Sequence, residues 1–222
     1  MLFLETLVVL SILTLFFITF EMLKIYQNTV AKSVSFEGVG LHSGKKTKIK
    51  ICPAEANKGI IFKRIDLIEN NLIPAVYSNV TSARLCTTLE NISGAKVSTV
   101  EHLLAALYLA EIDNAIVEIN NEEVPIMDGS AKVFLEEFQN LKLKKLDKKR
   151  KYLKILDKFN FSDNEKTISI EPTDSSLEVS FQLNYKNKII GDQKNYVNFL
   201  SDDLSDIYNS RTFCLYEDIE KI

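Results

Sequence analysis

The chain has 222 residues, of which 46% are hydrophobic and 26% are charged, with 27 basic against 30 acidic side chains and a formal net charge of −3. Abundant aliphatic residues, 13 Phe and 8 Tyr supply enough apolar surface for a core, which excludes a disordered chain. The slight acidic excess argues against a nucleic-acid-binding protein, because such proteins usually carry a basic excess, and we expect no nucleic-acid partner.

The chain begins with an apolar segment, residues 2–20, that contains a single charged residue, Glu5. As a helix it would be about 28 Å long, close to the roughly 30 Å hydrocarbon core of a bilayer. It lacks the preceding basic residues and the small-residue cleavage site of a signal peptide. Two interpretations of this leader, residues 1–21, stay open. It is a membrane anchor that leaves the body of the protein in the cytoplasm, or Met22 is the true start.

Residues 22–141 predict a first domain of short strands and two helices. Strands are expected at residues 33–36, 47–51, 59–63 and 115–119. The glycine-containing residues 38–44 predict a tight turn between strands rather than a phosphate-binding loop, because no helix follows them. His42 is therefore expected to be structural.

The first predicted helix begins with a capping box, in which Ser98 is the cap and Glu101 the third helical residue. Its apolar side chains recur at helical spacing and are Val100, Leu103, Leu104, Leu107 and Tyr108. The turn of residues 128–130 precedes a second helix, whose apolar side chains are Val133, Phe134, Phe138 and Leu141. We expect both helices to cover one face of a sheet, as in an α+β fold.

Residues 142–154 contain seven Lys and one Arg, which predicts a solvated basic linker between two domains. Residues 155–222 then predict a second α+β domain. Strands are expected at residues 168–170, 177–183, 196–199 and 211–214, and helices at residues 201–208 and 216–222. The last helix has no cap, so we expect the second domain to be incomplete.

Glu101 and His102 are the clearest candidates for catalytic side chains, because a carboxylate beside an imidazole is the minimum for a metal-bound hydrolytic site. The alternative is a purely structural role, in which Glu101 only caps the helix and His102 is a polar residue on its flank. The second histidine of an H-E-x-x-H motif is absent. The three cysteines are far apart, which excludes a Cys-x-x-Cys zinc site and favours a reducing compartment, with Cys86 as a small buried thiol.

Considered together, the motifs from about residue 22 to residue 222 resemble the UDP-3-O-acyl-N-acetylglucosamine deacetylases, the zinc enzymes of the committed step of lipid A synthesis. The motifs occur in the family's order. They are residues 38–45 (Gly-Val-Gly-Leu-His-Ser-Gly-Lys), 85–87 (Leu-Cys-Thr), 98–103 (Ser-Thr-Val-Glu-His-Leu), 112–114 (Ile-Asp-Asn), 124–130 (Val-Pro-Ile-Met-Asp-Gly-Ser), 210–213 (Ser-Arg-Thr-Phe) and 218–220 (Asp-Ile-Glu). The resemblance also favours Met22 as the first residue.

The resemblance implies a fold of two similar two-layer α/β sandwich domains, with the second truncated here, and a site between them. It also implies a cytoplasmic enzyme that uses Zn²⁺ to remove the N-acetyl group from a UDP-linked acylated glucosamine. By this resemblance His102 is a zinc ligand, Glu101 the general base, and Thr212 the hydroxyl that stabilises the oxyanion. The substrate-binding positions that it implies are Leu85 and Cys86 near the metal, and Phe213, Tyr216 and Ile219 at the entrance of the acyl-chain passage.

The chain also departs from the family's pattern. The family's other zinc ligands, a His and an Asp four residues apart, and its later general-acid His have no counterpart before Ile222. Because a catalytic zinc usually has three protein ligands, we expect these 222 residues alone to be inactive. We interpret the chain as the N-terminal part of a deacetylase. The alternatives are a membrane-tethered binding module without catalysis and a decayed fragment that does not fold stably.

Overall fold

The computed structural model describes residues 25–174 and 176–213. Its described residues divide into two compact units, a larger one that ends at residue 150 and takes up the chain again from residue 208, and a smaller one within residues 151–207. The apolar leader of residues 1–21 and the predicted helix of residues 216–222 lie outside the described residues. Within the described ranges, no helix is both long and apolar enough to cross a membrane.

The larger unit contains a five-stranded mixed sheet with the strand order β2-β3-β9-β4-β5. Its strands are β2 (Val34–Val39), β3 (Lys46–Pro53), β4 (Ile60–Arg64), β5 (Leu72–Pro74) and β9 (Ala115–Ile119). In β3, Thr47, Ile49 and Ile51 are buried and the lysines between them are exposed, because successive side chains of a strand point to opposite faces. Four of these strands overlap the predicted strands of residues 33–36, 47–51, 59–63 and 115–119, whereas β5 was not predicted.

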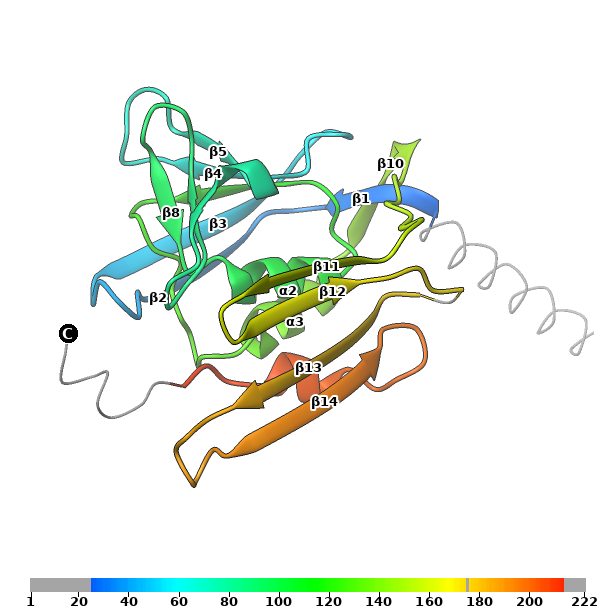
Figure 1. Ribbon diagram of the computed structural model, residues 1–222. Coiled ribbons are helices and arrows are strands. Elements are labelled where there is room, and N and C mark those ends of the chain that lie inside the picture. Colours follow the sequence, from blue (N-terminus) through cyan, green and yellow to red (C-terminus); the bar gives the residue numbers. More distant parts are fainter. Residues whose placement is uncertain (1–24, 175, 214–222) are drawn as a thin grey trace, which may run out of the picture. The chain divides into compact units, whose positions relative to one another are not determined.

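Two helices, α2 (Glu101–Leu109) and α3 (Lys132–Gln139), lie side by side and pack against the buried face of this sheet (Figure 1). Phe134 of α3 is fully buried and meets the ring of Phe36 edge-on, with ring centroids 5.0 Å apart. Helix α2 buries Leu103 and Leu107 as predicted, whereas Tyr108 at the margin of the predicted face is 59% exposed. The predicted α+β fold class is confirmed.

The larger unit has two further groups of strands. A three-stranded sheet consists of β6 (Val80–Ser82), β7 (Thr88–Glu90) and β8 (Lys96–Ser98). The 3-10 helix η1 (Tyr77–Asn79) directly precedes β6. A two-stranded ribbon pairs β1 (Tyr26–Val30) with β10 (Leu143–Lys149).

Strand β10 differs from the predicted basic linker of residues 142–154. Leu143 packs against the core of the larger unit, and the backbone of β10 pairs with β1, so most of this segment belongs to the first unit. The lysines remain exposed along the strand, which is compatible with an edge strand. The guanidinium of Arg150 forms an ion pair with Asp113 at 2.9 Å. The boundary between the two units falls after Arg150.

The smaller unit consists of two antiparallel hairpins. They are formed by β11 (Phe159–Asp163) with β12 (Lys166–Ile170) and by β13 (Glu178–Asn184) with β14 (Asp192–Asn198). A short helix, α4 (Ser205–Asn209), crosses the boundary between the units, and residues 211–213 do not form the predicted strand. The second two-layer sandwich stays a prediction.

Candidate active site

Glu101 and His102 are the first two residues of α2, and both side chains are half-buried. The predicted capping box is wrong. Ser98 is the last residue of β8, and its hydroxyl donates to the backbone oxygen of Glu122 rather than capping the helix. The sequence pattern failed because Thr99, between strand and helix, has a left-handed φ of 57°, which turns Ser98 away from the helix end. Glu101 is therefore free for a role other than capping.

The carboxylate of Glu101 accepts a hydrogen bond from the backbone N–H of Thr87, with Oε2 3.1 Å from the nitrogen. This contact brings the loop of residues 83–87 beside the start of α2. Leu85 in this loop has a φ of 66° and is 71% exposed, so its apolar side chain faces solvent. Cys86 is half-buried, and its Sγ lies 3.9 Å from Thr88 Oγ1. The structure thus brings the predicted residues Leu85 and Cys86 into the same region as Glu101.

The loop between β9 and α3, residues 120–131, contacts the ends of β2 and β8. Its backbone is bonded to Ser98 at the end of β8, through the N–H of Val124 at 3.1 Å. The N–H of Ile126 donates to the carbonyl of Val39 at the end of β2. The loop thereby joins the β2–β3 turn to the start of α2.

Thr212 and Arg211 lie against the same β9–α3 loop. The N–H of Thr212 donates to the carbonyl of Gly129 at 2.9 Å. The guanidinium of Arg211 donates to the backbone oxygen and to the carboxylate of Asp128, each at 3.1 Å. The pKa of Asp128 lies below its ordinary value, chiefly because the hydroxyl of Ser130 donates a hydrogen bond to its carboxylate. Burial raises this pKa, but the N–H of Ser130 and the charge of Arg211 lower it further. Thr212 is thus bonded to the loop through its backbone, and its neighbour Arg211 forms an ion pair with the same loop.

Phe213, next to Thr212, is 53% exposed, and its predicted contact with substrate stays a prediction. The other two predicted substrate-binding residues, Tyr216 and Ile219, lie outside the described residues, as does Cys214.

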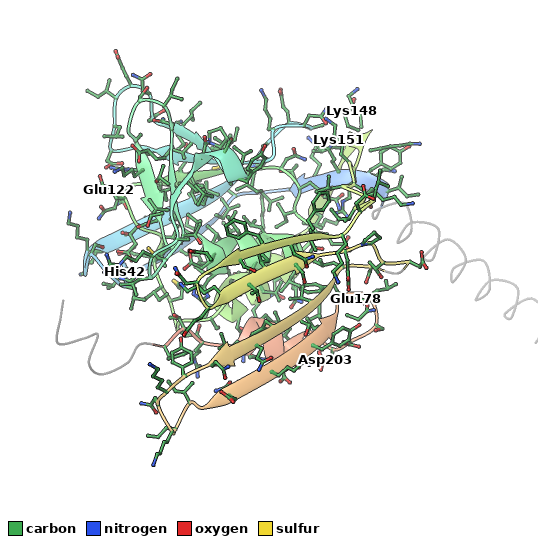
Figure 2. The ribbon with its side chains drawn as sticks, in the orientation of Figure 1. His42, Glu122, Lys148, Lys151, Glu178 and Asp203 are labelled. Carbon is green, nitrogen blue, oxygen red and sulfur yellow. The ribbon has the colours of Figure 1, made fainter. Side chains whose placement is uncertain are left out.

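The strongest polar cluster in this region is formed by Glu123, which the sequence analysis did not identify. Glu123 is 2% exposed, and its carboxylate accepts hydrogen bonds from the N–H groups of His42 and Ser43 at 2.9 and 2.8 Å. A third bond comes from the hydroxyl of the buried Thr99 at 3.0 Å. His42 itself is exposed in the turn between β2 and β3 (Figure 2), which confirms the predicted turn.

Glu123 is charged in the folded protein despite its burial. Burial alone raises the pKa of this carboxyl, but the hydrogen bonds from His42, Ser43 and Thr99 outweigh it and hold the pKa below its ordinary value. The sequence gives no signal for this role. Glu123 stands two positions before Pro125, in a loop whose residues show no periodic pattern of burial.

The described residues do not form a complete metal site. Across residues 25–174 and 176–213, no group of three or more His, Cys, Asp or Glu side chains is placed to hold a metal ion. His102 thus supplies one imidazole, where a catalytic zinc usually has three protein ligands. The donors present do not fit a zinc ion without further ligands.

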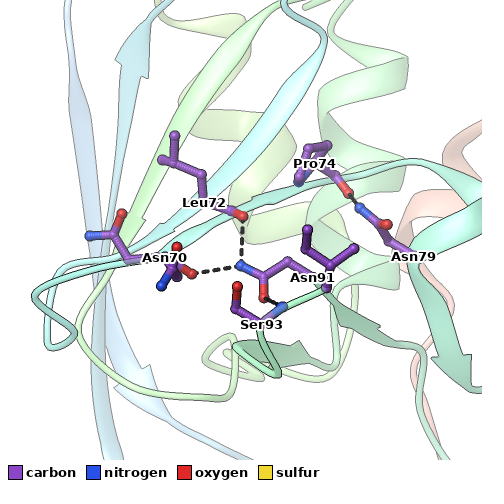
Figure 3. Close-up of a pocket in the computed structure, with 8 residues that line it drawn as sticks. Asn70, Leu72, Pro74, Asn79, Asn91 and Ser93 are labelled. Carbon is purple, nitrogen blue, oxygen red and sulfur yellow. Dashed lines mark hydrogen bonds between the residues drawn. The ribbon is translucent and has the colours of Figure 1, made fainter.

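A surface hollow elsewhere in the larger unit contains none of the predicted site residues (Figure 3). Its polar lining is mostly asparagine, and these amides bond to the protein itself. Asn91 donates to the carbonyls of Asn70 and Leu72 at 2.6 and 2.9 Å, and Asn79 donates to that of Pro74. The hollow is better explained as the packing of three loops than as a ligand site.

Over most of its length the chain is similar to proteins of one named family. The family model of the UDP-3-O-acyl N-acetylglycosamine deacetylases matches residues 27–222. The UDP-3-O-acyl-N-acetylglucosamine deacetylase of Geotalea uraniireducens (strain Rf4) is 41% identical over 198 residues, which cover 89% of this chain and 64% of that protein. The enzymes of the same name from Shewanella frigidimarina (strain NCIMB 400) and Shewanella baltica (strain OS155 / ATCC BAA-1091) are 40% and 39% identical over 199 residues, 88% of this chain and 65% of each relative.

The chain thus spans slightly less than two thirds of the length of the curated relatives that it matches. The match extends over both units and includes Glu101, His102 and the β9–α3 loop. On this evidence the chain belongs to the UDP-3-O-acyl-N-acetylglucosamine deacetylase family.

Proposed function

We propose that this chain provides the general base and the first zinc ligand of a deacetylase that hydrolyses the N-acetyl group of UDP-3-O-acyl-N-acetylglucosamine in lipid A synthesis. The observation that carries the proposal is the placement of Glu101 and His102 at the start of α2, with the carboxylate of Glu101 bonded to the N–H of Thr87 rather than used as a helix cap. The names of the relatives supply the substrate.

In this proposal Glu101 takes a proton from the attacking water. The hydrogen bond from Thr87 engages Oε2, and we assign Oε1 to the water. Thr212, held by its N–H to Gly129, donates its hydroxyl to the oxyanion that forms when water adds to the acetyl carbonyl. The bond between the carbonyl carbon and the nitrogen then breaks, the nitrogen takes up one proton in place of the one that Glu101 removed from water, and the products are acetate and the free amine of the sugar.

His102 offers one imidazole, and the described residues do not complete a zinc site, so the proposal includes no step through the metal. The cofactor is Zn²⁺ with further ligands from outside these residues. Leu85, Cys86 and Phe213 are proposed to contact the substrate. A cytoplasmic location also belongs to the proposal, and membrane attachment through residues 2–20 remains a prediction from the leader.

The test is a fused protein in which the last third of the Geotalea uraniireducens deacetylase follows residue 222. It is loaded with zinc and assayed for acetate release from UDP-3-O-acyl-N-acetylglucosamine, with the complete Geotalea enzyme as positive control. We expect release of one acetate for each amine formed. A fused protein that unfolds cooperatively and binds zinc, yet releases no acetate while the control does, would contradict the proposal.

A further inference from the structure

Glu123 is a buried anion whose hydrogen bonds all go to two segments next to the candidate site. Its two oxygens accept bonds from His42 and Ser43 in the β2–β3 turn and from the hydroxyl of Thr99. Thr99 lies two residues before Glu101 and has the left-handed backbone that a β-branched residue rarely adopts. A conformation of this kind persists only where its surroundings determine it, and the bond to Glu123 is part of those surroundings.

The backbone around the carboxylate is shaped to admit it. A Cβ at position 40 would overlap Glu123 Oε2 and Ser43 Oγ, so the turn needs Gly40 for space rather than for a positive φ. The backbone of the β9–α3 loop runs past the same two segments, with bonds to Val39 and Ser98. Three stretches of chain distant in sequence therefore meet at one carboxylate.

We propose that Glu123 is a positioning residue for the site that we assign to this family member: its carboxylate fixes the turn that carries His42 against the residue from which α2 begins, and so sets the direction of Glu101 and His102. The inference rests on the proposed function for what the positioned groups do. It adds a residue that contacts neither the water nor the sugar but acts through Thr99 and the β2–β3 turn.

The chemistry of the cluster requires a carboxylate rather than an amide. The groups that face Glu123 are the N–H groups of His42 and Ser43 and the hydroxyls of Ser43 and Thr99, all of them donors to it. A glutamine has nearly the same shape, but its NH₂ group would face an N–H without an acceptor between them. The Glu123→Gln variant should therefore release the turn while keeping the volume of the side chain.

The experiment compares amide and imidazole NMR signals of the 222-residue chain among variants. Glu123→Gln removes the charge, Thr99→Val removes the hydroxyl, and Thr99→Ser keeps it. Asp66→Asn is the matched control, because it also removes a carboxylate from a nearly buried partner, Arg64, which it contacts at 2.7 Å in the same unit.

Three results are expected. In Glu123→Gln the amide protons of His42 and Ser43 lose the downfield shift given by a charged acceptor, and the signals of Glu101 and the His102 imidazole move. Thr99→Val moves the signals of Glu101 and His102, whereas in Thr99→Ser these signals stay at their positions in the parent chain. Asp66→Asn lowers the thermal midpoint without moving these signals. If Glu123→Gln and Thr99→Val only lower the thermal midpoint, as Asp66→Asn does, Glu123 is a purely structural residue and the inference is wrong.

A kinetic measurement separates this inference from the proposed function. In the fused protein, Thr99→Val should lower kcat about tenfold to a hundredfold, because a catalytic group misplaced by about 1 Å can cost about a hundredfold in rate, and KM should change less. Unchanged kcat in a folded Thr99→Val protein counts against the inference. If the parent fused protein is inactive, the proposed function fails, and the NMR signals of Glu101 and His102 still decide whether Glu123 positions them.

Discussion

At the scale of single residues, the contact between Gly40 and Glu123 leads to a clear prediction. Gly40→Ala should destabilise the protein by about 1–3 kcal/mol, because the added methyl group overlaps the carboxylate. The free energy of unfolding in urea measures this cost. In a Glu123→Ala background the same substitution should cost less, because the overlap with the carboxylate is gone and only that with the rotatable hydroxyl of Ser43 is left. Equal costs in the two backgrounds would show that the overlap is not the cause.

The charge of Glu123 also predicts a pH dependence of stability. Its pKa is lowered in the folded state, so the charged form adds stability above the unfolded-state pKa of about 4.3, and this stability is lost as pH falls through the lower folded-state pKa. At pH 7, Glu123→Gln should cost about 1–3 kcal/mol, because buried N–H donors lose a charged acceptor.

Urea unfolding of both proteins between pH 7 and pH 3 tests this dependence. The difference between wild type and Glu123→Gln should shrink as the pH falls, and the subtraction removes the contributions of other carboxyl groups such as Asp66. A difference that stays constant over this range would mean that the pKa of Glu123 is the same in the folded and unfolded states, which would contradict the prediction.

At the scale of elements, the packing of α3 on the sheet supplies most of the aromatic core. Phe134 is fully buried against Phe36, so Phe134→Ala should cost about 3–5 kcal/mol in the free energy of unfolding. Phe159→Ala in β11 is the matched control, because this ring is 60% exposed, and it should change stability by less than about 0.5 kcal/mol. Similar losses in the two variants would contradict the described distribution of the core.

The elements also show what the sequence could and could not predict. The strand of residues 115–119 and the helix containing Phe134 and Phe138 were predictable, because apolar periodicity reports burial directly. The start of α2 was not, because the left-handed Thr99 places Ser98 in a strand although its spacing to Glu101 fits a capping box. Strand β10 was missed because its lysines conceal the pairing with β1, which only long-range contacts establish.

The candidate site, too, was partly predictable from the sequence and partly not. Motif resemblance identified Glu101, His102 and Thr212, but it did not reveal that one loop contacts the segments that carry them. Glu123 could not be found from spacing, because its partners His42 and Thr99 are 81 and 24 residues away along the chain. Such a cluster becomes visible only when the topology brings the β2–β3 turn, the start of α2 and the β9–α3 loop together.

At the scale of the whole molecule, burial is concentrated in the larger unit. Within the described ranges, Val197 is the one buried hydrophobic residue of residues 151–207, and rings such as Phe161 and Phe181 are well exposed. Amide hydrogen exchange should therefore be slow in β3, β9 and α2 and fast in β11–β14 of the 222-residue chain, because local opening costs little where few apolar contacts are lost. Equally slow exchange in both units would contradict this distribution.

The proposed role of Glu101 as the general base of a deacetylase is tested by kcat for acetate release, measured on the fused protein with Glu101→Gln. A loss of about a hundredfold or more is expected, the size of a general-base contribution. Glu137→Gln, which removes the same charge from the exposed side of α3, should leave kcat unchanged. If Glu101→Gln retains the activity of the parent protein, Glu101 is not the base and the assignment of the site to the start of α2 is wrong.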